Sequence, residues 1–307
     1  MANVLEYSKI FQTELDKVAV QDMVTGWMDG NAGQVKYTGG KEVKIPKLSV
    51  DGLADYGREG NTGFVGGDVT FEYETKSMTQ DRGRGFAIDA NDVDETGFVA
   101  TAGVIMGEFQ RTKVTPEIDA YRLSKLSALA LEENKKYSYE PSRITIIEEI
   151  KLGIKKIRQK GYNGPLAIHI TYDAMMEFEL AMLGKISSVD FSKGGLITKV
   201  PGIDGCPLIE TPENRMYSAI QLYDGKTEGQ KQGGYIKATK GIQMNFAIMP
   251  RSTPIAITKQ DNMRIFDPQT NQKANAWAMD YRRYHDLWVK DNAANSIYIN
   301  YKEAKPS

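Results

Sequence analysis

The sequence is poor in the residues that most often perform chemistry. Among 307 residues it has one cysteine, Cys206, and two histidines, His169 and His285. A lone cysteine excludes an intramolecular disulfide and a cysteine metal cluster, and sparing use of cysteine is typical of a reducing cytoplasm. The two histidines do not have metal-ligand spacing. Few groups are therefore left to act as nucleophile, general base or metal ligand.

Long apolar runs and an excess of charge are missing too. No apolar stretch is long enough to span a bilayer, and the first six residues lack the basic start and apolar stretch of a signal peptide. The net charge is -1, so bulk electrostatics draw the chain neither to nucleic acid nor to anionic lipid. We expect no membrane partner.

The catalytic and nucleotide-binding motifs are incomplete. The tripeptide 225–227, Gly-Lys-Thr, resembles the end of a phosphate-binding loop, but Ile220 stands where that loop needs a glycine. Cys206 has no indicated base nearby. His169 lies in an apolar run and His285 between Tyr and Asp, so both are expected to be structural. We predict no catalytic, cofactor-binding or metal-binding residue, no cofactor, and no enzyme activity.

Two charged clusters have plain structural explanations. Residues 89–95 are rich in oxygen ligands, but Val93 interrupts the calcium-loop register, so helix capping and solvated surface explain them better. Arg82 and Arg84 flank a glycine and can contact phosphate. With a balanced net charge, pairing with acids of the same or another subunit is favoured for these two arginines.

The chain is organised around residues 97–136. Phe98, Ile105, Met106 and Phe109 recur at helical spacing, and the tripeptide 115–117, Thr-Pro-Glu, has the N-cap, first-turn proline and acid of a second helix start. The pattern predicts two collinear helices or one helix kinked at Pro116. At 1.5 Å per residue such a spine extends about 50 Å.

The segment before this spine predicts an arm followed by a long hairpin. Residues 1–33 carry an amphipathic helical pattern, which fits either packing on the chain's own domain or contact with a neighbouring subunit. Residues 34–87 contain two alternating strands around a glycine-rich tip. A long two-stranded hairpin is only marginally stable alone, so its own chain or another copy must supply a surface for it. We select Tyr56, Arg58 and Phe64 at the tip as inter-subunit contacts.

The rest of the chain predicts a lobe and a β-rich return. Residues 137–245 alternate helix and strand, as in a compact α/β lobe, and the segment 145–148 matches a capping box. Residues 246–307 contain further strand patterns. The fold class is therefore α+β, with the division 1–33, 34–87, 88–136, 137–245 and 246–307.

The order of these elements, and the wording of residues 101–106 and 116–126, resemble the major capsid proteins of tailed bacteriophages, which have the HK97-like fold. The resemblance implies that 34–87 is the E-loop, which lies over a neighbour. It implies that the spine and the β-rich return form the P-domain, and that 137–245 is the A-domain around the centres of pentamers and hexamers. No residue matches the crosslinking lysine or asparagine of some members.

The resemblance implies a self-assembling icosahedral shell around double-stranded DNA, assembled in the bacterial cytoplasm and then part of the virion. It also implies a portal protein and, because the arm is short, a separate scaffolding protein, unless the sequence is a processed form. An encapsulin-like protein nanocompartment is the alternative within this fold. A monomeric α/β enzyme and a viral tail or adhesion protein are the alternatives from other classes.

Overall fold

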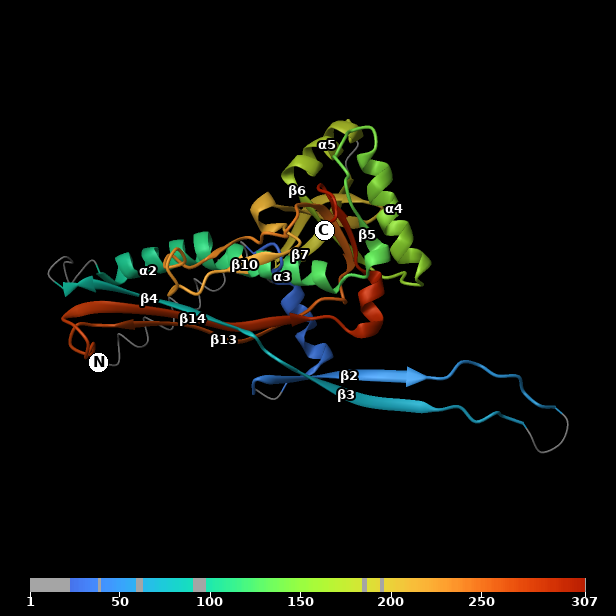
Figure 1. Ribbon diagram of the computed structural model, residues 1–307, viewed down its shortest axis with the longest axis horizontal. Helices are drawn as coiled ribbons and strands as arrows, with labels where there is room; N and C mark the ends of the chain where they lie inside the picture. The colour runs from blue at the N-terminus through green and yellow to red at the C-terminus, as the bar shows by residue number, and fades with distance from the viewer. Residues whose placement is uncertain are drawn as a thin grey trace.

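The computed structural model describes residues 23–37, 40–58, 63–90, 98–183, 187–193 and 196–306. A helical spine runs beside a narrow sheet, a lobe lies over one end of the spine, and a hairpin projects from the body (Figure 1). Residues 1–22 of the predicted arm, 1–33, and residues 91–95 of the acidic cluster, 89–95, lie outside the described residues.

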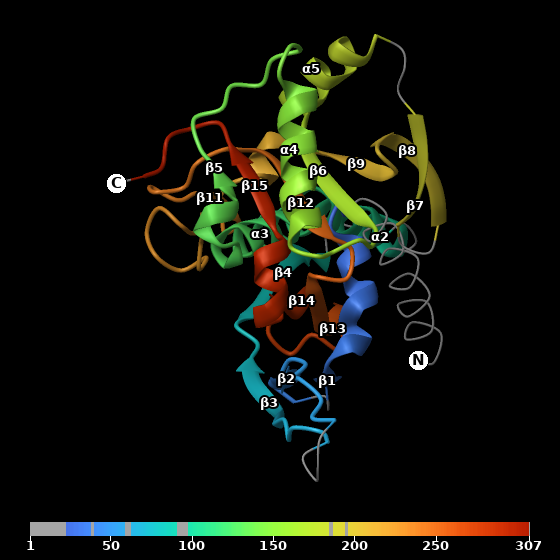
Figure 2. The same ribbon diagram turned by 90° about the vertical axis from the view of Figure 1, so that its right-hand side faces the viewer.

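The lobe is built on a seven-stranded sheet (Figure 2). Its strands, in spatial order, are β5 (Lys135–Lys136), β15 (Tyr298–Tyr301), β12 (Met244–Pro250), β6 (Leu166–Thr171), β9 (Cys206–Thr211), β8 (Leu196–Ile203) and β7 (Ser187–Lys193). The parallel pair β6–β9 encloses helix α5 (Tyr172–Met182) in its connection. The sequence did not predict the antiparallel pair β7–β8.

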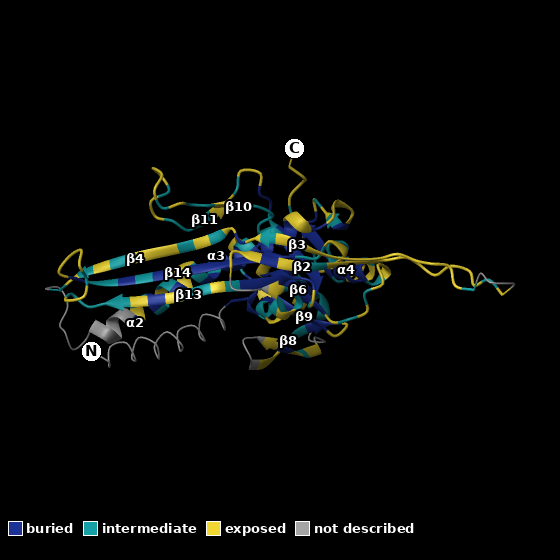
Figure 3. Ribbon diagram, turned by 90° about the horizontal axis from the view of Figure 1, so that it is seen from below, coloured by how far each residue is buried: buried dark blue, intermediate teal, exposed yellow. Residues whose placement is uncertain are grey.

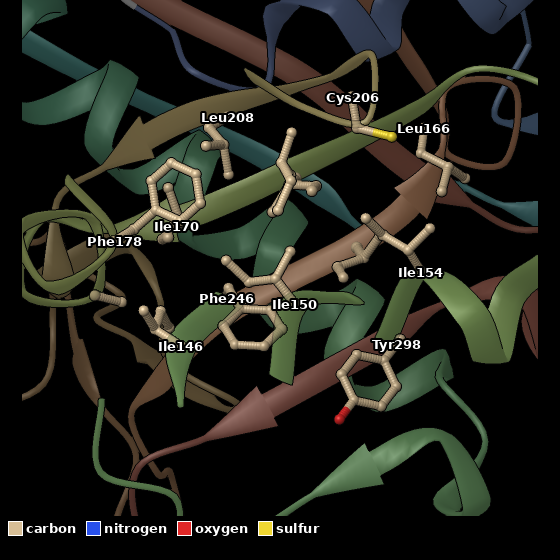
Figure 4. Close-up of a cluster of buried hydrophobic side chains, with 14 of the residues drawn as sticks. Ile146, Ile150, Ile154, Leu166, Ile170, Phe178, Cys206, Leu208, Phe246 and Tyr298 are labelled. Atoms are coloured by element: carbon tan, nitrogen blue, oxygen red, sulfur yellow. The ribbon is translucent and has the colours of Figure 1, made fainter. Parts of the chain in front are cut away.

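One face of this sheet is covered by α5 and by α4 (Ile146–Gln159). The isoleucine stripe of α4, with Ile150, Ile154 and Ile157, is buried against β6, β9 and β12 (Figure 4). Helix α4 ends just before Gly161, which adopts a φ of 90° that suits glycine after a helix. The capping box is not formed: the Thr145 hydroxyl lies 3.0 Å from the Tyr139 hydroxyl.

The other face of the sheet packs on the spine. Helix α3 (Thr115–Leu129) places Leu123 and Leu126 against Ala247 and Ile299 of the sheet. Ahead of it lie α2 (Phe98–Phe109) and a π-helical turn (Gln110–Val114). The predicted N-cap at Thr115 is wrong, because Thr115 is itself helical and its N–H donates to the Gln110 carbonyl. Proline lacks an N–H and its ring crowds the preceding turn, and the wider π turn accommodates Pro116.

The spine also covers a three-stranded sheet of order β13–β14–β4. Its strands are β4 (Gln80–Asp89), β13 (Ile255–Phe266) and β14 (Ala276–Trp288). The sequence analysis assigned β4 to the hairpin, but β4 pairs with β14 along its whole length. The segment 246–307 is likewise divided, since β13 and β14 lie here while β12 and β15 complete the lobe sheet.

The hairpin consists of β2 (Glu42–Val50) and β3 (Val69–Ser77), with the short β1 (Lys36–Tyr37) beside β2. The strands are nine residues long, shorter than the sequence analysis expected. A further pair, β10 (Ile220–Leu222) and β11 (Tyr235–Lys237), flanks a glycine-rich loop. Short 3-10 helices cover Gly26–Gln34, Glu132–Asn134, Glu213–Arg215 and Asp291–Ser296.

Candidate inter-subunit interface

The distal half of the β2–β3 hairpin exposes one apolar face. Residues that pair across antiparallel strands project to the same side. Three such pairs share one side of the hairpin: Pro46 with Tyr73, Leu48 with Phe71, and Val50 with Val69. Leu48 is 62% exposed and Phe71 is 57% exposed, values that belong to side chains without a cover. Figure 3 shows the exposed residues along the projecting hairpin.

The opposite side of the same hairpin is apolar only at its base. Val43 and Ile45 lie on this side and are buried against Ile255, Ile257 and Trp288. Farther out the side becomes polar, and Lys47 forms an ion pair of 3.1 Å with Asp291 of the body. The apolar character therefore changes sides along the hairpin. The distal apolar residues therefore lie on the side of the hairpin that is turned away from the chain's own core, and that core cannot cover them.

The tip brings two of the three selected residues together. The rings of Tyr56 and Phe64 pack edge to face at 4.9 Å between centroids, and Phe64 is 90% exposed. Arg58 is exposed and forms no ion pair with any described residue. Leu53 is fully exposed near the tip as well. It was not among the predicted contacts, because these were chosen from the bulky or charged groups that lie among the glycines. No described contact tests the proposed role of the three residues.

The spine is held to the segment before the hairpin by buried charges. Asp119 is fully buried and accepts hydrogen bonds from the Val24 and Thr25 N–H groups at 3.1 and 3.0 Å. Arg215 adds an ion pair of 2.9 Å to the same carboxylate. One turn later, the buried Arg122 donates to both carboxylate oxygens of Asp29. These contacts hold residues 24–29 against the spine.

A second polar group joins the spine to the narrow sheet. Asp286 is buried and accepts hydrogen bonds from the Tyr121 hydroxyl at 2.7 Å and the Thr79 N–H at 2.9 Å. It also forms an ion pair with Lys125. Burial raises the pKa of Asp286. The hydrogen bond and positive charge of Lys125, together with the hydrogen bond from the Tyr121 hydroxyl, outweigh this and leave the pKa lowered overall. The carboxylate is therefore ionised in the folded chain at neutral pH.

Arg82 confirms the prediction that this arginine pairs with an acid, here one of the same chain. It donates to both oxygens of Glu117 at 2.6 and 3.0 Å. Its Nη1 donates to the Tyr223 carbonyl, and Nη2, which also donates to Glu117, donates to the Gly234 carbonyl; these residues lie at the two ends of the glycine-rich loop. Arg84 donates to the Lys231 carbonyl of that loop. Both arginines thus fasten the loop to β4.

The remaining candidates are structural. His169 is fully buried; its Nε2 accepts from the Trp27 indole at 3.3 Å and its Nδ1 lies 3.2 Å from the Thr211 hydroxyl. Cys206 is buried, and burial raises the pKa of its thiol, which makes it unreactive. Within the described ranges, no group of histidine, cysteine and acidic residues has metal-site geometry. No described helix is long and apolar enough to cross a membrane.

Comparison by sequence is silent, since no protein-family model and no curated protein matches this chain. Comparison by structure finds many matches. The capsid structure of cyanophage P-SCSP1u gives a TM-score of 0.55 at 7% identity, covering 87% of this chain and 84% of its own. The Mycobacterium phage Che8 structure gives 0.52 at 11% identity, covering 85% and 84%. The mature capsid of bacteriophage PhiM1 gives 0.51 at 10% identity, covering 84% and 81%. The chain has the HK97-like fold of phage capsid proteins, and the predicted fold class is confirmed.

Proposed function

We propose that this chain is a major capsid protein that assembles through pentamers and hexamers into an icosahedral shell around double-stranded DNA. The observation that carries the proposal is the distal apolar face of the β2–β3 hairpin, which lies on the side opposite to the hairpin's own buried base. Such a face needs another molecule to cover it, and in an HK97-like shell that molecule is a neighbouring copy.

The energy available from this contact supports assembly. Burying a side chain such as Leu48 or Phe71 contributes roughly 1.5–3 kcal/mol each. A few such side chains per hairpin offset part of the entropy lost on association, but do not make one contact strong by themselves. A shell multiplies a modest contact over all its subunits. The proposal therefore needs no single large interface.

The parts of the chain take the roles that the fold suggests. The hairpin is the E-loop, with Tyr56, Arg58 and Phe64 in contact with a neighbour. The spine and the β4–β14–β13 sheet form the P-domain, and the lobe forms the A-domain around the pentamer and hexamer axes. A separate scaffolding protein and a portal protein complete assembly in the bacterial cytoplasm, and the finished shell is part of the virion.

The test replaces the hairpin's apolar face without shortening the hairpin. In the double variant L48S/F71S, we expect folded subunits that form no closed shells in negative-stain electron microscopy. The matched control S49A/T70A changes the neighbouring pair on the opposite, polar side and should assemble like the unmodified chain. Normal shells from L48S/F71S would overturn the proposal.

The contents of the shell separate the two kinds of container. Particles purified from infected or induced bacteria and treated with nuclease should retain protected double-stranded DNA. Particles that instead enclose a defined protein and no DNA would identify a nanocompartment. Monomers under every condition would contradict both, and would return attention to a monomeric function.

A further inference from the structure

A cavity of about 860 Å³ lies where the spine, the narrow sheet and the loop between β10 and β11 meet. Its floor is formed by β4 and β14, one wall by the π turn and the start of α3, and its roof by residues 223–237. In Figure 1 the connection between β10 and β11 lies beside the spine and β4. The proposed shell contacts use none of these residues.

The cavity is lined by six arginine and lysine side chains and only three carboxylates. All three carboxylates are engaged. Asp81 binds Arg282, Glu117 binds Arg82, and Asp224 accepts from the Lys226 and Thr227 N–H groups. These hydrogen bonds, with that of the Thr227 hydroxyl first among them, lower the pKa of Asp224 to about 2. The loop is thus braced by its own acid, and no lining acid is left for further cations.

Three lining cations have no carboxylate partner among the described residues: Arg84, Lys113 and Lys226. Each belongs to a different side of the cavity, since Arg84 lies on β4 in the floor, Lys113 in the π turn of the wall and Lys226 in the loop of the roof. Arg84 donates to a backbone carbonyl. Three positive groups from the floor, a wall and the roof therefore line one cavity without a carboxylate partner among the described residues.

Two buried basic side chains lie on the floor of the cavity. Arg283 and His285 are more than nine-tenths buried there, and Arg283 forms an ion pair of 2.7 Å with Asp261. Among the described residues, Arg283 Nε and His285 Nδ1 have no hydrogen-bond partner. Burial, and then the charges of Arg283, Arg122, Lys125 and Arg82, hold the pKa of His285 well below its usual range, so the imidazole is neutral at neutral pH.

We propose that this cavity binds a small molecule bearing a linear polyphosphate, with its phosphates between Arg84, Lys113 and Lys226. An anion with several charges along its length matches three cations that line one cavity better than separate carboxylates do, and guanidinium and ammonium groups are the usual partners of phosphate. Gly225, Gly233 and Gly234 line the roof without side chains that would keep a phosphate away. Tyr223 and Tyr235 offer rings for an attached base.

Equilibrium dialysis of the full chain against inorganic triphosphate tests the proposal. We expect saturable binding at low salt, weakening as salt is added. Each of R84Q, K113Q and K226Q should weaken it by about tenfold. The control K155Q removes an exposed lysine on α4, away from the cavity, and should bind like the unmodified chain. If ATP binds more tightly than triphosphate, the rings of Tyr223 and Tyr235 contribute to the affinity. If the two bind equally, the affinity comes from the phosphates alone.

Histidine NMR on unassembled subunits gives a second measurement. Bound phosphate should raise the pKa of His285, because an added negative charge favours the imidazolium. The resonance of His169, which lies in the lobe, serves as the reference. The proposal would be overturned if triphosphate showed no saturable binding, or if the triple variant R84Q/K113Q/K226Q bound it as tightly as the unmodified chain. Binding of an acidic peptide but not of triphosphate would overturn it as well. Shell formation is scored separately by microscopy, so failure of this site and failure of the capsid function are distinguishable.

Discussion

Asp119 illustrates how the chain places charge inside the body at the scale of single residues. The carboxylate is fully buried, yet two backbone N–H groups, the Thr25 hydroxyl and Arg215 all donate to it. A buried charge is tolerated only with such complete pairing. The stability of the folded subunit therefore depends on keeping all of these donors paired with the Asp119 carboxylate.

The variant D119N should destabilise the subunit by about 3–5 kcal/mol, because the amide brings its own N–H groups to a buried site of donors and leaves the partly buried Arg215 without its counter-charge. Urea unfolding of unassembled subunits measures the change. The control D204N removes the exposed partner of Lys151 at 3.5 Å and should change stability by less than about 1 kcal/mol. Equal losses in the two variants would refute the role of Asp119.

His285 predicts how stability responds to acid. Its folded pKa lies well below the ordinary value of 6.5, so between these two values the unfolded chain binds a proton that the folded chain does not. Stability is therefore fully present above about pH 6.5 and falls as the pH decreases toward the folded pKa. Chemical unfolding across pH 5–7 in about half-unit steps should show a shallower fall for H285Q than for the unmodified chain. Parallel pH curves would contradict this.

Sequence reasoning at this scale succeeded where a residue's partners follow from its type. Arg82 was expected to pair with an acid and does so with Glu117, and His169 was expected in the core and is buried there. It failed at Thr115 and Thr145, because a cap depends on where the backbone leaves the helix. At Thr115 the helix has already begun, because the π turn precedes it. At Thr145 the hydroxyl forms a hydrogen bond with the Tyr139 hydroxyl instead of capping the helix.

At the scale of elements, α4 depends on close contact with the sheet below it. A Cβ at Gly153 would lie 2.6 Å from Tyr298 Cδ1 and 2.7 Å from Ile248 Cδ1, both in the buried cluster of Figure 4. Contacts this short cannot form without displacing the helix or the side chains. Glycine is therefore required here by packing, although alanine is the better helix former.

We accordingly expect G153A to destabilise the subunit by about 1–3 kcal/mol, the usual cost of overpacking, despite a gain of about 1 kcal/mol in helix propensity. Differential scanning calorimetry of unassembled subunits measures the shift. The variant K155A, on the exposed side of α4, should be neutral or slightly stabilising. A higher melting temperature for G153A than for K155A would contradict the packing argument.

Most elements were predictable because their patterns are local. Alternation identified β2 and β3, and the isoleucine stripe identified α4. The partner of β4 was not predictable, because the strand that pairs with it, β14, lies almost two hundred residues later in the chain. The same holds for β15, which returns to the lobe sheet instead of the β-rich segment beside it in sequence. Pairing at long range follows from the completed core and leaves little local signal.

At the scale of the whole molecule, the distal end of the hairpin, residues 51–68, should be dispensable for folding and essential for assembly. Residues 51–58 and 63–68 form no regular strand, and Asp51 pairs only with Asp68 within the hairpin. Replacing residues 51–68 by the turn Asn-Gly should keep the Val50–Val69 pair and leave the melting temperature of the subunit unchanged. Electron microscopy should find no closed shells, and normal shells would show that the tip is not needed.

The change of apolar side along the hairpin has a consequence for growth. A contact in which one copy's hairpin covers a different region of the next copy is heterologous, so every unfinished array leaves as many bare hairpins as vacant receiving surfaces at its edge. An open array can always add another subunit, whereas a closed one has no ends left to fill. In the proposed shell, addition of subunits then stops only when the shell closes. The size of the shell is set by the curvature at which the last hairpins meet the last vacant surfaces.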